Sequence, residues 1–177
     1  MIGLKRGDVN LLNHRAQWLK EFEKEKKRIF GKVGNSIVDI QHIGSTSVPG
    51  LKAKPIIDIS VGIFCFKDAK KLIKPLRVMG YGFDRKFQHQ MFFAKGPDAK
   101  RTHYLHVMRY NGMKWKSDKL FKDLQRLGFN NISFKKVMKG NVFYTIYANS
   151  PYYTLENIKP RMDFIIYSIE IRRKGNI

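Results

Sequence analysis

The sequence predicts one domain of the α/β (α+β) class, in which a mixed β-sheet is flanked by helices. Segments with helical spacing of apolar residues alternate with short apolar segments rich in β-branched residues, and turn-forming residues separate them. The length of 177 residues is enough to bury a real core. A hydrophobic fraction of 43% is typical of a folded globule, despite the high charge. We therefore expect a single domain over residues 1–177.

The first half of the chain predicts a helix, two strands and a turn between them. Trp18, Phe22 and Ile29 recur at helical spacing among lysines and glutamates, which indicates an amphipathic helix that Gly31 and Gly34 end. The next segment alternates apolar and polar residues, and a later one is nearly all apolar, as in a buried strand. The expected elements are a helix at 12–30, a strand at 37–43, a loop or short helical turn at 45–51 and a strand at 56–63.

The second half predicts further strands followed by helices. Gly80 ends an amphipathic segment as a C-cap residue would. The expected elements are a helix at 67–79, strands at 81–83, 90–94 and 103–109, and helices at 119–127 and 159–172. Residues 128–151 are ambiguous: 142–147 are typical of a strand, and 134–138 fit either type.

The composition indicates a basic protein of the cytoplasm. Cys65 is the only cysteine, which excludes an intrachain disulfide and a cysteine framework for zinc. The sequence contains no apolar run approaching the roughly 18 residues of a membrane span. The 35 Lys and Arg residues against 14 Asp and Glu give a net charge of +21. Such a charge attracts nucleotides and nucleic acids in a salt-dependent way. Because the basic residues are spread along the chain, we expect a generally basic surface. Any binding of nucleic acid by this surface is expected to be non-specific.

A hydroxyl-rich turn follows the strand expected at 37–43. Gly44 and Ser45 come directly off this strand, where a glycine allows close backbone approach and a serine offers its hydroxyl and its amide. Thr46 adds a hydroxyl, and Lys54 places positive charge just beyond. The arrangement suits a phosphate, although Gly-Ser turns also commonly begin helices for purely structural reasons.

Asp58 is a charged residue inside the apolar strand expected at 56–63. A buried carboxylate is costly unless it is paired, hydrogen-bonded or bound to metal. We therefore expect Asp58 either to bind a cation or to meet a donor such as Arg101 or a histidine. Strand alternation places Asp58 and Ser60 on one face, and Ile57 and Ile59 on the other.

A Gly-Ser turn after a strand, followed by an aspartate in an apolar strand, resembles the nucleotidyltransferase superfamily. The segment HIGSTSVPGLKAKPIIDI is specifically similar to the GrpB-like family. Further matches are Trp18, Phe22 and Glu23 in its first helix, residues 101–107 (RTHYLHV) in its histidine-bearing strand, and residues 121–124 (FKDL) in its Phe-Arg-Asp-x-Leu element. The resemblance covers residues 10–124, and beyond them only residues 153–165 correspond to the family pattern.

The resemblance implies a nucleotidyltransferase-like fold and a metal-dependent site. In the superfamily, carboxylates hold Mg²⁺ ions that neutralise a triphosphate and align an attacking hydroxyl while pyrophosphate leaves. Gly44 and Ser45 would then hold phosphate, and Asp58 would be the metal ligand. The sequence departs from the pattern at Ser60, a neutral hydroxyl in the place of the second carboxylate. GrpB-like proteins commonly lack an acid here, so a normal two-metal arrangement is not expected.

Histidines offer further candidates for acid/base chemistry or for binding Mn²⁺ or Zn²⁺. His103 and His106 are three residues apart, and such positions on a regular strand point to opposite faces unless a bulge intervenes. A structural hydrogen bond is the default role for each, and the resemblance gives His106 equal weight as a catalytic group. His42 is expected to orient the turn, and Asp39 is a remote candidate for the missing acid.

These observations lead to one expected function and one alternative. We expect binding of a nucleoside triphosphate or other phosphorylated ligand with a divalent metal, and nucleotidyl transfer to an acceptor that the sequence does not identify. The expected site consists of Asp58 and His106 as catalytic residues, Asp58 as metal ligand, and Gly44, Ser45, Thr46, Lys54 and Arg101 around the phosphates. The alternative is a non-catalytic nucleotide- or RNA-binding module, in which Ser60 marks lost chemistry.

Overall fold

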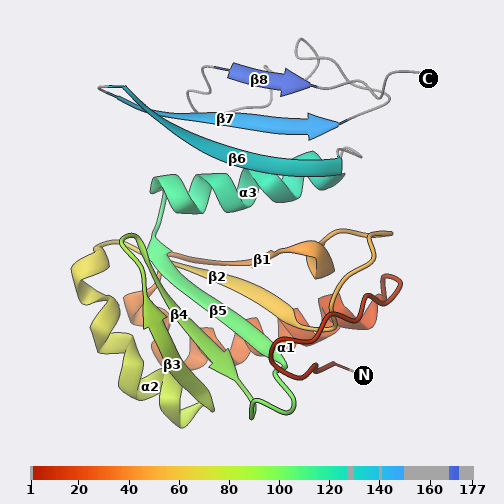
Figure 1. The fold of residues 1–177 in the computed structure, drawn as a ribbon. Helices are drawn as coiled ribbons and strands as arrows, with labels where there is room; N and C mark the ends of the chain where they lie inside the picture. Colours follow the sequence, from red (N-terminus) through yellow and green to blue (C-terminus); the bar gives the residue numbers. More distant parts are fainter. Residues whose placement is uncertain (1, 127–129, 140, 150–167, 172–177) are drawn as a thin grey trace. The chain divides into compact units, whose positions relative to one another are not determined.

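The computed structural model describes residues 2–126, 130–139, 141–149 and 168–171. The chain divides into two compact units, Met1–Lys122 and Asp123–Ile177 (Figure 1). The first unit contains a five-stranded sheet and the second a three-stranded sheet. The single domain expected over residues 1–177 stays a prediction.

A mixed five-stranded sheet organises the first unit. Its strands follow the order β1-β2-β5-β4-β3, with β2 and β5 parallel and every other neighbouring pair antiparallel. The strands are β1 (Asp39–Ile43), β2 (Ile57–Ile63), β3 (Tyr81–Lys86), β4 (Gln90–Lys95) and β5 (His103–Arg109). The expected class, a mixed sheet flanked by helices, is confirmed.

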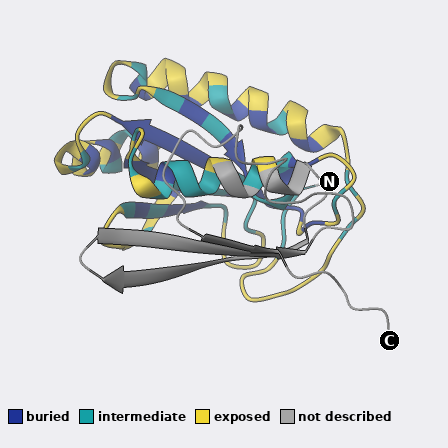
Figure 2. Cartoon of the chain, turned by 90° about the horizontal axis from the view of Figure 1, so that it is seen from above, coloured by how far each residue is buried: buried dark blue, intermediate teal, exposed yellow. Residues whose placement is uncertain are grey.

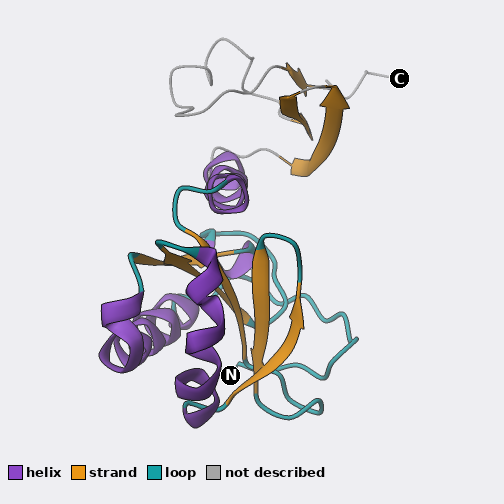
Figure 3. Cartoon of the chain, turned by 90° about the vertical axis from the view of Figure 1, so that its left-hand side faces the viewer, coloured by secondary structure: helices purple, strands orange, loops and turns teal. Residues whose placement is uncertain are grey.

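Helices cover this sheet, and 3-10 turns link them to the strands. The α-helices are α1 (Gln17–Val33), α2 (Ile73–Val78) and α3 (Met113–Arg126), and the 3-10 helices are η1 (Gly34–Ser36), η2 (Ser45–Ser47) and η3 (Phe66–Leu72). Figure 3 shows α1 and α2 together on one side of the five-stranded sheet.

The core lies between this side of the sheet and the apolar stripes of α1 and α2. Alternate residues of β2, from Ile57 to Ile63, are buried beside Trp18 and Phe22 of α1 and Leu76 of α2. Each such side chain contributes roughly 1.5–3 kcal/mol on burial. In Figure 2 the central strands β2 and β5 are mostly buried, whereas α1 keeps an exposed outer stripe. The amphipathic pattern of the sequence therefore decides which side of α1 meets the sheet.

One ion pair is enclosed in this apolar layer. Glu25 of α1 is 3% exposed, and its carboxylate accepts a hydrogen bond of 2.6 Å from Nζ of Lys95 on β4. Its second oxygen accepts a bond of 2.9 Å from Arg28. The ammonium of Lys95 and the other cations nearby more than offset the effect of burial, so the pKa of Glu25 lies below its usual value. The pair joins α1 to the end of β4.

Helix α3 begins on the opposite face of the sheet. Trp115 is buried, and a Cβ placed on Gly62 of β2 would lie 3.0 Å from its indole ring. Farther along the helix, Nζ of Lys122 donates a hydrogen bond of 2.8 Å to the carbonyl oxygen of His42 on β1. The face of the sheet that carries Gly62 is therefore covered by the first turns of α3.

The first helix differs from its predicted bounds at both ends. It begins at Gln17 instead of residue 12, because the backbone of Leu12 exchanges hydrogen bonds with Ala53 in an isolated bridge. It also continues past Gly31, since a single helical glycine costs only about 1 kcal/mol. Gly34, by contrast, marks the change to a 3-10 turn as expected.

The segment expected to form a helix at 67–79 divides into η3 and the short helix α2. Pro75 lacks an N–H group and cannot donate to the carbonyl four residues earlier, so an α-helix tolerates it only in the first turn, and α2 accordingly begins at Ile73. Gly80 ends α2 as predicted, with a φ of +88° and its amide 2.9 Å from the carbonyl oxygen of Arg77. Strand β3 extends to Lys86, and α3 starts six residues before the predicted residue 119, at Met113.

The second unit contains strands β6 (Asn130–Lys139), β7 (Asn141–Asn149) and β8 (Ser168–Ile171), in that order. The strand expected at 142–147 is confirmed, and the ambiguous residues 134–138 are also a strand. The helix expected at 159–172 is wrong for residues 168–171, whose backbone pairs in parallel with β7. The remainder of that predicted helix lies outside the described residues. Among the residues that the structure describes, no helix is long and apolar enough to span a membrane.

Candidate functional site

The predicted polar face of β2 is confirmed by the pairing of its neighbours. Asp58 is the register partner of Tyr104 on β5, and Ser60 is the partner of His106. Because paired residues of adjacent strands point to the same face, these four side chains share the face opposite the apolar core. The side chain of Asp58 remains 30% exposed, so a ligand can reach its carboxylate.

Gly44 and Asp58 are in direct contact. Gly44 has a φ of +67° and a ψ of −177°, a conformation that side-chain-bearing residues rarely adopt. A Cβ at this position would lie 2.7 Å from Oδ2 of Asp58. Glycine is therefore required here because the acid packs against the backbone of the turn. The hydroxyl-rich turn and the carboxylate thus form one corner of the sheet, as the sequence predicts.

The turn itself is a short 3-10 helix, and two of its three hydroxyl groups have partners within the protein. Ser47 donates a hydrogen bond of 2.7 Å to the carbonyl oxygen of Gly44. Thr46 is 2% exposed and lies 3.0 Å from Nε2 of His42, so its hydroxyl is occupied inside the protein. The hydroxyl of Ser45 has no hydrogen-bond partner within the described ranges. Ser45 is therefore the hydroxyl of this turn that remains for a ligand.

His42 fixes the turn from the core side. Its ring is 4% exposed and stacks on Phe22 of α1, with centroids 4.7 Å apart and planes 13° from parallel. Burial, followed by the positive charge of Lys122, lowers the pKa of His42 to about 3. The ring is therefore neutral at physiological pH, and its contact with Thr46 confirms the expected role in orienting the turn.

His106 is the histidine that meets Asp58. Its Nε2 lies 3.8 Å from Oδ1 of Asp58. Its Nδ1 and the hydroxyl of its neighbour Ser60 are buried polar atoms without a hydrogen-bond partner in the described part of the chain. Burial, followed by the charge of Asp58, raises the pKa of the adjacent Tyr104. The corner thus combines one carboxylate, one imidazole and unoccupied hydrogen-bonding capacity.

His103 lies on the opposite face, as the spacing of three residues predicts. It is 5% exposed, and its Nδ1 lies 3.0 Å from the hydroxyl of Thr102. Burial lowers the pKa of His103 to about 4, against the opposing effect of Glu25. His103 therefore belongs to the core side and is not part of the corner around Asp58.

Three other candidates form no hydrogen bond or ion pair with Asp58 among the described residues. The guanidinium of Arg101 donates a hydrogen bond of 2.8 Å to the carbonyl oxygen of Gly96 and forms an ion pair with Asp98. It therefore holds the turn between β4 and β5. Lys54 is exposed, and its side chain has no partner among the residues described. Asp39 accepts hydrogen bonds from the amide of Ile40 and the side chain of Gln41.

Asp39 cannot replace the missing second carboxylate at Asp58. Its register partner is Gly62, four residues along β2 from Asp58. At about 3.3 Å per residue, the two acids are separated by roughly 13 Å. No group of three histidine, cysteine, aspartate or glutamate side chains in the described ranges is arranged to hold a metal. The described side chains thus offer no complete set of protein ligands for a metal.

Asp118 on α3 is an acid near this face that belongs to none of the sequence motifs described above. Its side chain is 14% exposed; one oxygen pairs with Lys114, while Oδ2 is buried without a partner within the described portion. Trp115, Asp118 and Lys122 lie on one side of the helix by their spacing. Because Trp115 contacts Gly62 and Lys122 reaches His42, Asp118 lies over the part of the sheet between them. The sequence signal that could have revealed Asp118 is its position three residues after Trp115, on the side of the helix that carries this large apolar residue.

Comparisons with known proteins show which family this sequence resembles. Residues 8–127 match the family described as GrpB protein. The chain is 38% identical over 129 residues to the Glutamate-rich protein GrpB of Alkalihalophilus pseudofirmus, covering 70% of this chain and 74% of that protein. It is 40% identical over 95 residues to a UPF0157 protein of Halalkalibacterium halodurans, covering 51% of this chain and 48% of that protein.

A solved structure shows a similar fold. The crystal structure of the conserved protein GrpB from Enterococcus faecalis superimposes with a TM-score of 0.62 at 27% identity, covering 67% of this chain and 73% of that one. The matched family region, residues 8–127, includes the Gly44 turn, Asp58, His106 and Asp118. With the expected corner present and the family region spanning all five strands of the first sheet, the chain belongs to the GrpB family.

Proposed function

We propose that this GrpB-family protein binds a nucleoside triphosphate, or another phosphorylated ligand, together with one divalent cation at the corner formed by Gly44, Ser45 and Asp58. The observation behind the proposal is the contact between Gly44 and Asp58, which places an accessible carboxylate against a turn with a free hydroxyl. A phosphate held at the turn would therefore lie beside an acid, and a cation between them would compensate both negative charges.

The donor set fits one hard cation better than two. Mg²⁺ keeps several waters and is commonly held by one or two carboxylates together with substrate phosphates. Asp58 supplies one carboxylate, the neighbouring Ser60 is neutral, and Asp39 is too distant. Mn²⁺ is an alternative because the imidazole of His106 lies at the same corner. Zn²⁺ is less suited, since it prefers several nitrogen or sulfur ligands from the protein. A bound Mg²⁺ would neutralise phosphate charge and align the phosphoryl group.

The corresponding reaction is nucleotidyl transfer to an acceptor hydroxyl. In such a transfer the hydroxyl oxygen forms a bond to the α-phosphorus, the bond from that phosphorus to the pyrophosphate oxygen breaks, and pyrophosphate leaves. His106 lies beside Asp58 with its second nitrogen buried, and it is the residue that we propose accepts the hydroxyl proton. Asp118 is a further candidate for orienting the acceptor from the α3 side.

Titration calorimetry tests the binding site directly. Wild type and Asp58→Asn would be titrated with ATP, GTP, CTP and UTP in Mg²⁺, in Mn²⁺ and in EDTA. Asp39→Asn is the matched control, because it removes an acid from the same face about 13 Å away. We expect metal-dependent binding that Asp58→Asn weakens at least tenfold, on the order of one lost charge-assisted contact, and that Asp39→Asn retains.

Two results would contradict the proposal. One is the absence of binding by wild type with any nucleotide and metal, and the other is equal binding by wild type and Asp58→Asn. Release of pyrophosphate on incubation with candidate acceptors would separate an enzyme from a binding module, since only the enzyme produces it in a metal-dependent manner.

A further inference from the structure

A basic and aromatic pocket lies at the other end of β2 from Asp58. The cavity has a volume of about 600 Å³ and lies where β2 and β5 end. Its lining includes Arg109 and the residues around Phe66. Because β2 and β5 are parallel, their carboxyl ends meet at this edge of the sheet. Phe64 follows Asp58 by six residues, or roughly 20 Å of extended strand. The pocket is therefore separate from the proposed phosphate corner.

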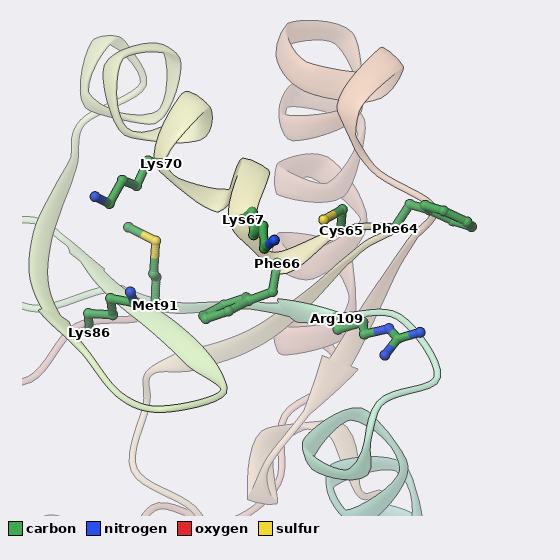
Figure 4. A pocket seen from close by; sticks show the side chains of 8 residues that line it. All are labelled: Phe64, Cys65, Phe66, Lys67, Lys70, Lys86, Met91 and Arg109. Carbon is green, nitrogen blue, oxygen red and sulfur yellow. The ribbon is translucent and has the colours of Figure 1, made fainter.

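Cations surround this pocket without acidic partners. Figure 4 shows Phe66 in the middle, Lys70 and Lys86 towards Met91, and Arg109 at the other end. The pocket is lined by four basic side chains, Lys67, Lys70, Lys86 and Arg109, and by no aspartate or glutamate. In the described part of the structure, the side chains of Lys67, Lys70 and Arg109 form no hydrogen bond or ion pair. Such a gathering of like charges is unfavourable unless an anion compensates it.

Aromatic side chains accompany the cations. Phe64 is 86% exposed at the end of β2, an unusual position for a large apolar residue. Nζ of Lys86 lies 6.0 Å from the ring centroid of Phe66, within reach of a cation–π contact. An exposed ring beside unpaired cations is a combination with which proteins bind single-stranded nucleic acid, because a base stacks on the ring and phosphates meet the lysines and arginines.

The length of the depression favours a strand over a small molecule. A second cavity of about 430 Å³ shares Phe66 and Arg109 with the first, so the two adjoin. It continues along Tyr110 to Lys114 and is also lined without an acid. Small-ligand sites enclose their ligand and orient it by a few fixed polar groups. Here the polar groups of the first pocket are flexible cations at the surface, which recognise a chain of phosphates without fixing one orientation.

We propose that this groove, defined by the two adjoining cavities, binds single-stranded RNA in a sequence-independent manner. Phosphates contact Lys67, Lys70 and Arg109, and a base stacks on the exposed ring of Phe64. The site is independent of the corner around Asp58, and it needs no divalent cation. It also gives a location to the polyanion attraction that a net charge of +21 implies.

Fluorescence anisotropy with a labelled oligouridylate tests the proposal over a series of NaCl concentrations in EDTA. The double variant Lys67→Ala/Lys70→Ala should weaken binding roughly tenfold and reduce the slope of log affinity against log salt by about 1.4, because each lost phosphate contact on a single strand accounts for about 0.7. Phe64→Ala should weaken binding about fivefold or more without changing the slope, since stacking is uncharged.

Two control variants make the result specific to the groove. Lys24→Ala/Lys27→Ala removes the same charge from the exposed side of α1, and it should change affinity by less than about twofold. Asp58→Asn should retain RNA binding, which separates this proposal from the phosphate corner. Equal weakening by both lysine pairs, an unchanged Phe64→Ala variant, or no binding by wild type would overturn the proposal. Wild type could instead sediment with phosphatidylserine vesicles, with Lys67→Ala/Lys70→Ala losing this sedimentation but still binding RNA. That result would assign the groove to an anionic membrane.

Discussion

Gly44 is the residue on which the geometry of the corner around Asp58 depends most directly. Its positive φ allows the chain to turn off β1, and its lack of a side chain leaves room for the carboxylate of Asp58. Sequence reasoning assigns the glycine to close approach of a ligand. The structure shows that the approaching group is the protein's own acid, which no local pattern could reveal because Asp58 arrives from another strand.

Substitution of Gly44 by alanine should destabilise the protein for two separable reasons. The positive φ costs about 1 kcal/mol for a residue with a Cβ, and the contact of 2.7 Å with Asp58 adds to it, for a total of roughly 2–3 kcal/mol. Gly50→Ala is the matched control, since Gly50 has a φ of +81° and open space around it. Urea denaturation measures both, and a loss in Gly44→Ala no greater than in Gly50→Ala would show that the acid does not crowd this position.

At the scale of elements, α1 is held to the sheet by a charged contact inside an apolar layer. Glu25→Gln leaves the ammonium of Lys95 enclosed without its carboxylate, and we expect a loss of about 3 kcal/mol in the free energy of unfolding. Glu23→Gln, on the exposed side of the same helix, should stay within about 0.5 kcal/mol. Chemical denaturation of both variants is the measurement.

A compensating double variant distinguishes loss of the ion pair from general damage to α1. Replacing Glu25 by Gln and Lys95 by Met removes both charges, and most of the lost stability should return. If the double variant is as unstable as Glu25→Gln alone, the unpaired ammonium is not the cause of the loss.

The accuracy of the sequence prediction also varies by element. Strand β5 has its predicted bounds, because alternation along it directly reflects burial on one face. The predicted helix boundaries are wrong where a contact with a distant part of the chain decides them. The pairing of Leu12 with Ala53, for example, keeps Leu12 out of α1. Residues 168–171 form a strand because β7 offers them backbone partners, which overrides the helical spacing of their side chains.

The candidate site was predictable in part for the same reason. Gly44 and the orienting role of His42 follow from one short sequence pattern, and Asp58 follows from its place in an apolar strand. The pairing of Arg101 with Asp98 and the arrival of Asp118 from α3 depend on turn geometry and helix packing. Those contacts join parts of the chain that no periodicity relates.

At the scale of the whole molecule, two buried histidines should make the stability of the protein sensitive to mild acid. The folded-state pKa values of His42 and His103 are lowered to about 3 and about 4, whereas the unfolded chain titrates near 6.5. Below pH 6.5 the unfolded state therefore binds more protons, and stability falls as the pH decreases. The contribution of the two neutral rings to the free energy of unfolding is fully present above pH 6.5. The loss from His42 alone should be about 2 kcal/mol between pH 7 and pH 5.

Urea unfolding of wild type at pH 7 and pH 5 measures this loss. His42→Gln should be less stable at pH 7 but should lose less on acidification than wild type does. His89→Gln is the control, since His89 is exposed and should leave the pH dependence unchanged. Equal pH dependence in His42→Gln and wild type would show that this ring does not remain neutral in the folded state.

The length of β2 has a consequence for ligand occupancy. Its acid and its aromatic end are separated by roughly 20 Å of sheet, more than twice the screening distance of about 8 Å at physiological ionic strength. Two negatively charged molecules bound at these ends would hardly repel each other. One strand could thus keep a polymer and a metal-bearing nucleotide on the same protein at the same time, with neither displacing the other.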